Sequence, residues 1–161
     1  MTQLGLFVRE STIRQSYEQL PVYKVTLVRE SSVPLDQPHF RSSQNAATML
    51  QAYLKDANRE HCVVLLLNRK NRLIGLNTVS IGSLTASVVH PREVFKPAIL
   101  GNAAAVILCH NHPSGDPAPS QEDRVLTKRL VEAGKLLGID ILDHIIVGDG
   151  RYFSFADEGL L

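Results

Sequence analysis

Apolar residues follow two different periods along this chain, and each period predicts a different kind of element. Residues 120–137 carry leucines at helical spacing and are followed by Gly138, a typical helix stop. Two shorter helices are predicted, one over residues 43–55 behind a capping serine and one over 91–100 with a proline in its first turn. The chain therefore has three predicted helices.

Runs of β-branched and apolar residues, separated by polar turns, predict the strands. These runs cover residues 21–29, 62–68, 72–80, 83–89, 104–109, 139–147 and 152–155. Short turns join two pairs of them into hairpins, 62–68 with 72–80 and 139–147 with 152–155. The unbroken apolar run at 62–68 indicates a strand buried on both faces. Strands in runs with few helices indicate an α/β chain of the α+β kind, in which helices flank a mixed β-sheet.

The length of 161 residues corresponds to one ordinary domain with one core. Residues 1–20 show no sustained period. We therefore expect residues 1–39 to form an arm and a first strand that pack on a domain made by residues 40–161.

Composition excludes several classes of protein. Apolar residues make up 44% of the chain and charged residues 20%, which argues against disorder. No apolar run approaches the ~18 residues of a membrane span. The two cysteines are too few for a disulfide framework, and no secretory signal is evident, so we expect a cytoplasmic protein. The net charge of +1 gives no excess of positive charge for binding a nucleic acid.

The chemically informative segment follows the apolar run 104–109. His110 and His112 stand two residues apart at a strand end, so both side chains point to one side while Asn111 points away. Asp123 lies in the first turn of the following helix, and a loop rich in proline and glycine returns that turn toward the strand end. Two imidazoles and one carboxylate suit Zn²⁺ and leave a fourth position for water, as in catalytic zinc sites.

Plainer interpretations exist for the same residues. Ser120 and Asp123 form a Ser-x-x-Asp pair, a variant of the capping box at a helix start. A capping role and a metal-binding role are compatible, and the Ser120 hydroxyl can serve either. Asp116, in the loop, is a weaker alternative to Asp123 as a ligand because Gly-Asp-Pro is already good turn chemistry.

An activated water needs a base, and glutamate is the usual one in zinc peptidases. Three glutamates are candidates on sequence grounds. Glu122 leaves its helix about 100° away from Asp123, and Glu93 has an ordinary explanation in the first turn of a helix. Glu60 opens an apolar strand and could stand at the rim of the sheet, which favours it modestly.

Three further residues are interpreted as structural. Cys109 precedes His110 on a strand and so faces the other side, as a buried small apolar residue would. His90 and His144 could support the metal ligands, but ordinary structural histidines are the favoured interpretation.

The combination of Glu60 with His110-x-His112-Pro113, and of Ser120 three residues before Asp123, resembles the JAMM motif of MPN/JAB metalloprotease-like domains. The longer strings at 59–67, 89–97 and 110–117, with Leu142-Asp-His144, are similar to the bacterial RadC family in particular. The likeness extends from about residue 40 to the end.

The resemblance implies a curved central sheet flanked by helices, of cytidine-deaminase-like or JAB/MPN architecture. It implies one Zn²⁺ per chain held by His110, His112 and Asp123, with Glu60 acting on the zinc water and Ser120 stabilising an oxyanion. The implied activity is that of a zinc metallopeptidase acting on a peptide or protein substrate.

Two other functions stay open at this point. The RadC name comes from a supposed role in DNA repair, so a nuclease or other DNA-processing factor is an alternative, with nucleic acid as partner. Its support is limited to scattered basic clusters such as Arg69-Lys70-Arg72, and the helix-hairpin-helix region of longer family members is not evident here. The other alternative is a metal-binding interaction module without turnover.

Overall fold

Five strands form one mixed sheet in the described part of the chain, which comprises residues 20–35, 38–82 and 89–161 of this computed structural model. In chain order they are β1 (His61–Leu67), β2 (Leu73–Ile81), β3 (Ala105–Asn111), β4 (Asp140–Val147) and β5 (Tyr152–Ser154). Their order in the sheet is β2-β1-β3-β4-β5. β3 and β4 run parallel, and the other neighbouring pairs are antiparallel.

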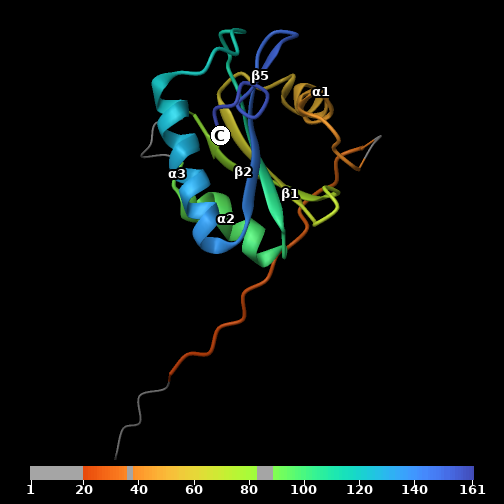
Figure 1. The fold of residues 1–161 in the computed structure, drawn as a ribbon. Coiled ribbons are helices and arrows are strands. Elements are labelled where there is room, and N and C mark those ends of the chain that lie inside the picture. The colour runs from red at the N-terminus through yellow and green to blue at the C-terminus, as the bar shows by residue number, and fades with distance from the viewer. Residues whose placement is uncertain (1–19, 36–37, 83–88) are drawn as a thin grey trace, which may run out of the picture.

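Helices cover both faces of this sheet (Figure 1). They are α1 (Ser43–Leu54), α2 (Pro91–Leu100) and α3 (Gln121–Leu137). α3 forms the crossover between the parallel strands β3 and β4, a connection that a short hairpin turn cannot make. α2 and α3 lie on one face and α1 on the other, so the domain has three layers.

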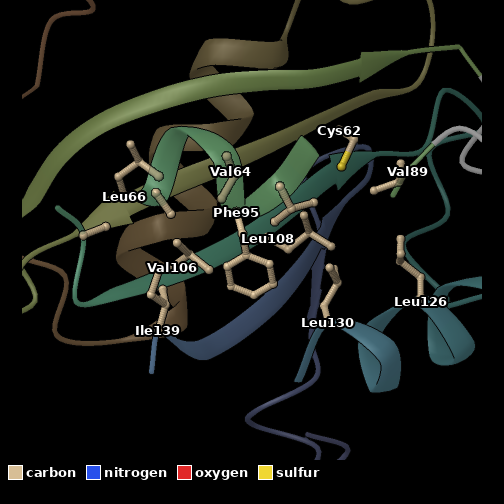
Figure 2. Packing of buried hydrophobic residues seen from close by; sticks show 13 residues of the cluster. Cys62, Val64, Leu66, Val89, Phe95, Val106, Leu108, Leu126, Leu130 and Ile139 are labelled. Carbon is tan, nitrogen blue, oxygen red and sulfur yellow. The ribbon is translucent and has the colours of Figure 1, made fainter. Parts of the chain in front are cut away.

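Successive residues of β1 supply two separate cores, because side chains alternate between the faces of a strand. Cys62, Val64 and Leu66 pack with α2 and α3, whereas Val63, Leu65 and Leu67 pack with α1. Figure 2 shows the first of these cores, with the ring of Phe95 reaching from α2 toward the strand side chains. This double burial explains why β1 is apolar at nearly every position.

The predicted α+β class and most predicted elements are confirmed, with small differences at their ends. The strand predicted at 104–109 continues to Asn111, so His110 lies within β3 rather than in a loop. Of the strand predicted at 83–89, residues 83–88 lie outside the described part of the chain. None of the helices in the described ranges is long and apolar enough to cross a membrane.

The strand predicted at 21–29 is wrong. Residues 20–35 form neither helix nor strand, and side chains such as Val22 (95%) and Tyr23 (83%) are exposed. Alternation of β-branched residues is a local property, but a strand also requires a neighbour to accept and donate its backbone hydrogen bonds. This segment has the first property and lacks a neighbouring strand in the described chain.

Gly134 allows α3 to turn directly into β4. The Ile139 amide donates to the Gly134 carbonyl at 3.1 Å, so the two backbones are in close contact. A Cβ at this position would lie 2.5 Å from the Ile139 carbonyl oxygen and 3.3 Å from Phe95 Cζ. Both neighbouring residues are buried, so moving either of them would cost free energy.

We therefore expect Gly134→Ala to destabilise the fold by about 1–3 kcal/mol, in spite of the better helix propensity of alanine. The free energy of unfolding in urea measures the effect. Lys135→Ala, at the adjacent exposed position of the same helix, is the control and should change stability by less than about 0.5 kcal/mol. Equal or higher stability of Gly134→Ala would contradict the close contact.

Candidate metal centre

Two histidines meet at the end of β3, on the side toward α3. His110 is buried within the strand, and His112 follows the strand directly. Their Nε2 atoms lie 3.0 Å apart, so the two side chains do point to the same side as their spacing predicts. Only 15% of the His112 side chain is exposed, and none of the His110 side chain.

Asp123 brings a buried carboxylate to these imidazoles from the first turn of α3. Its Oδ1 lies 3.3 Å from His110 Nε2, and its Oδ2 lies 3.8 Å from His112 Nε2. The predicted capping box is confirmed. The Ser120 N–H and hydroxyl donate to Asp123 Oδ2 at 2.8 and 2.6 Å, and the Asp123 N–H donates to Ser120 Oγ at 3.1 Å. The helix cap therefore fixes the direction of the carboxylate.

Glu60 lies beside His112, just before β1. Its Oε1 is 3.7 Å from His112 Nε2. One ligand atom from each of Glu60, His110 and His112 lies within 4.8 Å of the others, so these three residues form a group that could hold a metal ion. Asp123 is outside this group of three, but its carboxylate faces the same two imidazoles.

The other two candidate glutamates are elsewhere. Glu122 is exposed, while its neighbour Asp123 is buried, as the helical angle between them predicts. Glu93 lies on the surface of α2 and pairs with Lys96, which holds the pKa of the Glu93 carboxyl below its ordinary value. Among these candidates, the fold brings only Glu60 to the histidines.

The loop after His112 orients its imidazole. His112 Nδ1 lies 2.7 Å from the carbonyl oxygen of Asp116. Because a carbonyl only accepts, Nδ1 carries a hydrogen, and Nε2 is the ring nitrogen that faces Asp123 and Glu60. The Asp116 carboxylate instead accepts from the Ala118 N–H at 3.2 Å, which is a turn contact. Asp116 thus acts through its backbone, and its side chain serves the turn.

The same loop packs tightly on the turn between β4 and β5. The Asp149 N–H donates to the Gly115 carbonyl at 2.9 Å, and a Cβ on Gly148 would lie 2.3 Å from that oxygen. Gly115 itself has a φ of +81°, a conformation that favours glycine. The glycines therefore let two loops meet closely enough to hold the Asp116 carbonyl in place.

Asn111 points away from the histidines, as predicted, but it has a role that the sequence did not reveal. Its Oδ1 accepts from the His61 N–H at 2.8 Å, and its Nδ2 donates to the Arg59 carbonyl at 2.9 Å. These two backbone groups flank Glu60 on either side. A single side chain of β3 therefore fixes the segment that carries Glu60, and the available signal was a polar residue within a buried strand.

His144 also differs from its favoured interpretation as an ordinary structural histidine. It is wholly buried in β4, and its Nε2 lies 2.9 Å from His110 Nδ1. Its ring stacks on that of Phe155 at 4.9 Å. His90 does cap α2, accepting from the Arg92 N–H at 3.2 Å, and Cys109 is buried on the α1 side, so both of those predictions are confirmed.

Burial controls the protonation of the groups around this centre. Desolvation, reinforced by the neighbouring imidazoles, holds the pKa of His110 and of His144 well below the ordinary 6.5. Burial, reinforced by the carboxylates of Glu60 and Asp123, raises the pKa of the Cys62 thiol to about 12. At neutral pH the histidines are therefore neutral and able to donate lone pairs, whereas Cys62 stays a thiol and is a poor ligand.

An open groove gives access to one side of the centre. It is lined by Arg59, Glu60, Gly82, His112, Pro113 and Ser114. Glu60 and His112 thus face the groove, whereas His110 and Asp123 lie behind them in the protein.

A mixed sheet between helices, with paired histidines and carboxylates at the end of a central strand, defines a JAB/MPN-like domain with a candidate metal site. The family model of the RadC-like JAB domain matches residues 40–160. The chain belongs to this family, and the predicted resemblance is confirmed.

Relatives agree with this assignment. A UPF0758 protein of Desulforamulus reducens is 54% identical over 121 residues, which cover 75% of this chain and 53% of the relative. UPF0758 proteins of Methanosarcina mazei and Clostridium acetobutylicum are 49% and 55% identical, covering 87% and 74% of this chain and 61% and 52% of the relatives. The chain therefore spans only about half to three fifths of the length of these relatives, and their names state no activity.

Acidification is expected to destabilise the metal-free protein, because His110 and His144 are neutral in the fold but titrate near 6.5 in the unfolded chain. Their folded pKa lies below the unfolded one, so the unfolded chain binds more protons at acid pH. Stability is therefore complete above about pH 6.5 and falls as the pH drops below it. With about 1.4 kcal/mol per group and pH unit, the loss at about pH 5.5 should be about 2–3 kcal/mol.

Urea unfolding at several pH values, with a chelator present, measures this loss. The matched variant is His144→Gln, which removes one of the two groups and should lower the pH-dependent part by about half. If the free energy of unfolding falls equally with pH in the wild type and in His144→Gln, then His144 is not one of the groups responsible.

Proposed function

We propose that this domain is a zinc-dependent hydrolase that cleaves a peptide or isopeptide bond. The observation that carries the proposal is the convergence of two imidazoles and two carboxylates at the rim of an open groove. The family assignment adds support for a JAB-type metal site. The substrate proposed is a protein or peptide.

The donor set suits zinc. Neutral imidazole nitrogens and a carboxylate oxygen are typical ligands of Zn²⁺, and three protein ligands leave one position for water or substrate. His112 turns its Nε2 to the site, and the Asp123 carboxylate lies close to both rings. The neutral state of His110 means that little free energy is needed to deprotonate it before a metal binds.

Two of the four residues are exposed to the groove and two are buried, and this difference supports separate roles for the carboxylates. Asp123 is 2% exposed and fixed by two donors from Ser120, as a permanent ligand should be. The Glu60 side chain is 23% exposed and lines the groove, where it can contact water and substrate. We therefore assign His110, His112 and Asp123 as metal ligands and Glu60 as general base.

The proposed reaction is the addition of water to an amide carbonyl. A zinc ion held by His110, His112 and Asp123 would lower the pKa of water to about 7 and would polarise the carbonyl. Glu60 accepts a proton from the attacking water, whose oxygen forms the new bond to the carbonyl carbon. Glu60 then passes the proton to the leaving amine as the C–N bond breaks, so that a carboxylic acid and an amine are released.

Ser120 is assigned a second task besides holding Asp123. Asp123 Oδ2 has two donors from Ser120, the backbone N–H at 2.8 Å and the hydroxyl at 2.6 Å. The hydroxyl can turn toward a negatively charged oxygen on the substrate while the backbone donor continues to orient the carboxylate. In this role Ser120 stabilises the developing oxyanion.

Glu60→Gln distinguishes a base from a ligand. If Glu60 is the base, the variant should keep about one equivalent of zinc and lose about 10²–10⁴ of the rate of peptide or isopeptide cleavage. Metal content by elemental analysis and turnover of a peptide and isopeptide library are the two measurements. Asp123→Asn should instead lose zinc as well as activity, because it removes the charged ligand.

Glu93→Gln, on the exposed surface of α2, is the control and should behave as wild type in both measurements. Loss of zinc from Glu60→Gln would make Glu60 a ligand and overturn the assignment. Absence of turnover in the zinc-loaded wild type across the whole library would overturn the proposed activity.

Asn111→Ala tests whether the position of Glu60 matters. The substitution removes both hydrogen bonds that hold the backbone on either side of Glu60. A displacement of about 1 Å in a catalytic group can cost about 10² in rate, so we expect a loss of that size with zinc still bound.

The conservative variant Asn111→Asp keeps an acceptor for the His61 N–H but places a second oxygen against the Arg59 carbonyl, so we expect intermediate activity. Full activity of the folded, zinc-loaded Asn111→Ala protein would show that the segment is held adequately by β1 alone.

A further inference from the structure

A continuous chain of buried hydrogen bonds connects His110 with the backbone of Asp123. His110 Nδ1 lies 2.9 Å from His144 Nε2, and His144 Nδ1 lies 2.6 Å from Thr127 Oγ1. The Thr127 hydroxyl in turn lies 2.6 Å from the carbonyl oxygen of Asp123. All four residues are at most 2% exposed, so water cannot replace any of these partners. The chain crosses from β3 through β4 to α3.

The direction of every hydrogen in this chain follows from its last member. The Asp123 carbonyl can only accept, so the single hydrogen of the Thr127 hydroxyl is committed to it. Thr127 Oγ1 can then only accept from His144, which places a hydrogen on His144 Nδ1. The buried ring of His144 is neutral, so its Nε2 carries a lone pair and accepts from His110 Nδ1. His110 is left with its lone pair on Nε2.

This result matters because His110 Nε2 is the atom that faces Asp123 and His112. Nε2 lies 3.3 Å from Asp123 Oδ1 and 3.0 Å from His112 Nε2. The Asp116 carbonyl independently accepts from His112 Nδ1 at 2.7 Å, so Nε2 is the nitrogen that His112 turns to this point. The His110 lone pair is therefore directed toward the Asp123 carboxylate and His112 Nε2, the groups that would share a metal ion with it.

We infer that Thr127 and His144 are positioning residues, which hold metal-free His110 in its Nδ1-protonated tautomer so that Nε2 is ready to bind a metal ion. The inference rests on the metal-binding part of the proposed function, and it does not require that the protein hydrolyses anything. Hydrogen bonds from a metal-binding histidine to an outer partner typically change metal affinity by about 10–100-fold when they are removed.

The chain also couples the two buried ligands. The Asp123 carboxylate faces His110 directly, and the Asp123 carbonyl sets the His110 tautomer through Thr127 and His144. Loss of the Thr127 hydroxyl therefore affects the His110 imidazole, which this hydroxyl does not contact. His144 can then move its hydrogen from Nδ1 to Nε2, which forces His110 Nδ1 to accept and places the His110 hydrogen on Nε2, where it blocks the metal.

The direct test is the tautomer of His110 in the metal-free protein, with all 161 residues present. Long-range proton–nitrogen correlation spectra of ¹⁵N-labelled protein distinguish a protonated ring nitrogen from one that carries a lone pair. We expect a hydrogen on Nδ1 of His110 and on Nδ1 of His144. A His110 protonated at Nε2 would overturn the inference without the need for any variant.

Thr127→Val and Thr127→Ser form a matched pair for the second test. Valine preserves the shape of threonine without the hydroxyl, whereas serine retains the hydroxyl. We expect Thr127→Val to move the His110 hydrogen to Nε2 and to weaken zinc binding by about 10–100-fold in competition with a chromophoric chelator at neutral pH. Thr127→Ser should match wild type in both properties.

Thermal unfolding of both metal-free variants separates positioning from simple stabilisation. A purely structural Thr127 would lower the unfolding temperature of Thr127→Val while leaving the tautomer and the zinc affinity of the folded protein unchanged, and that result would overturn the inference. The proposed hydrolase function can fail separately. If the tautomers and the zinc affinities are as expected but the protein has no peptidase activity, the proposed function is wrong and the positioning role of Thr127 and His144 still holds.

Discussion

The central strand β3 is the constraint on which the rest of this structure depends. It is paired on both sides, antiparallel with β1 and parallel with β4, and both of its faces are covered by helices. Every residue from Ala105 to Asn111 is buried, so β3 has almost no freedom to shift. The register that pairs Cys62 with His110 also brings Glu60 beside His112. The position of the candidate centre is thus a consequence of sheet pairing.

Burying imidazoles at the end of such a strand costs free energy, and hydrogen bonds from the neighbouring elements offset this cost. A buried polar group without a partner costs about 1–3 kcal/mol, and His110 and His144 are wholly buried. In the described residues no buried side-chain nitrogen or oxygen lacks a hydrogen-bond partner. The same contacts that satisfy these rings also set where their hydrogens lie. The stability of this region and the orientation of its buried imidazoles therefore depend on one set of hydrogen bonds.

Backbone groups provide most of the control over this centre. The Asp116 carbonyl orients His112, the Ser120 N–H orients Asp123, and Asn111 fixes the backbone on both sides of Glu60. Backbone atoms are held by turns and strands and move less than long side chains. The candidate metal centre is consequently supported by tight loops, including the close contact between Gly115 and Gly148.

Much of this protein was predictable from the sequence because the signals are local. Periodicity marked the three helices and most of the strands, since one element determines its own pattern of buried and exposed residues. The spacing of His110 and His112 and the Ser120–Asp123 cap also act over a few residues, so they indicated a candidate metal site before any contact was known. Residues 21–29 show the limit of such signals, because strand propensity alone does not provide a pairing partner.

Contacts between distant segments were decided only by the tertiary structure. The choice of Glu60 over Glu93 and Glu122 depends on the register of β1 against β3, and the roles of Asn111, Thr127 and His144 depend on atoms far away in the chain. Short-range patterns contain no information about which buried side chains meet across a sheet or beneath a helix. The sequence determined most of the elements and the types of candidate ligand, whereas packing determined which atoms meet.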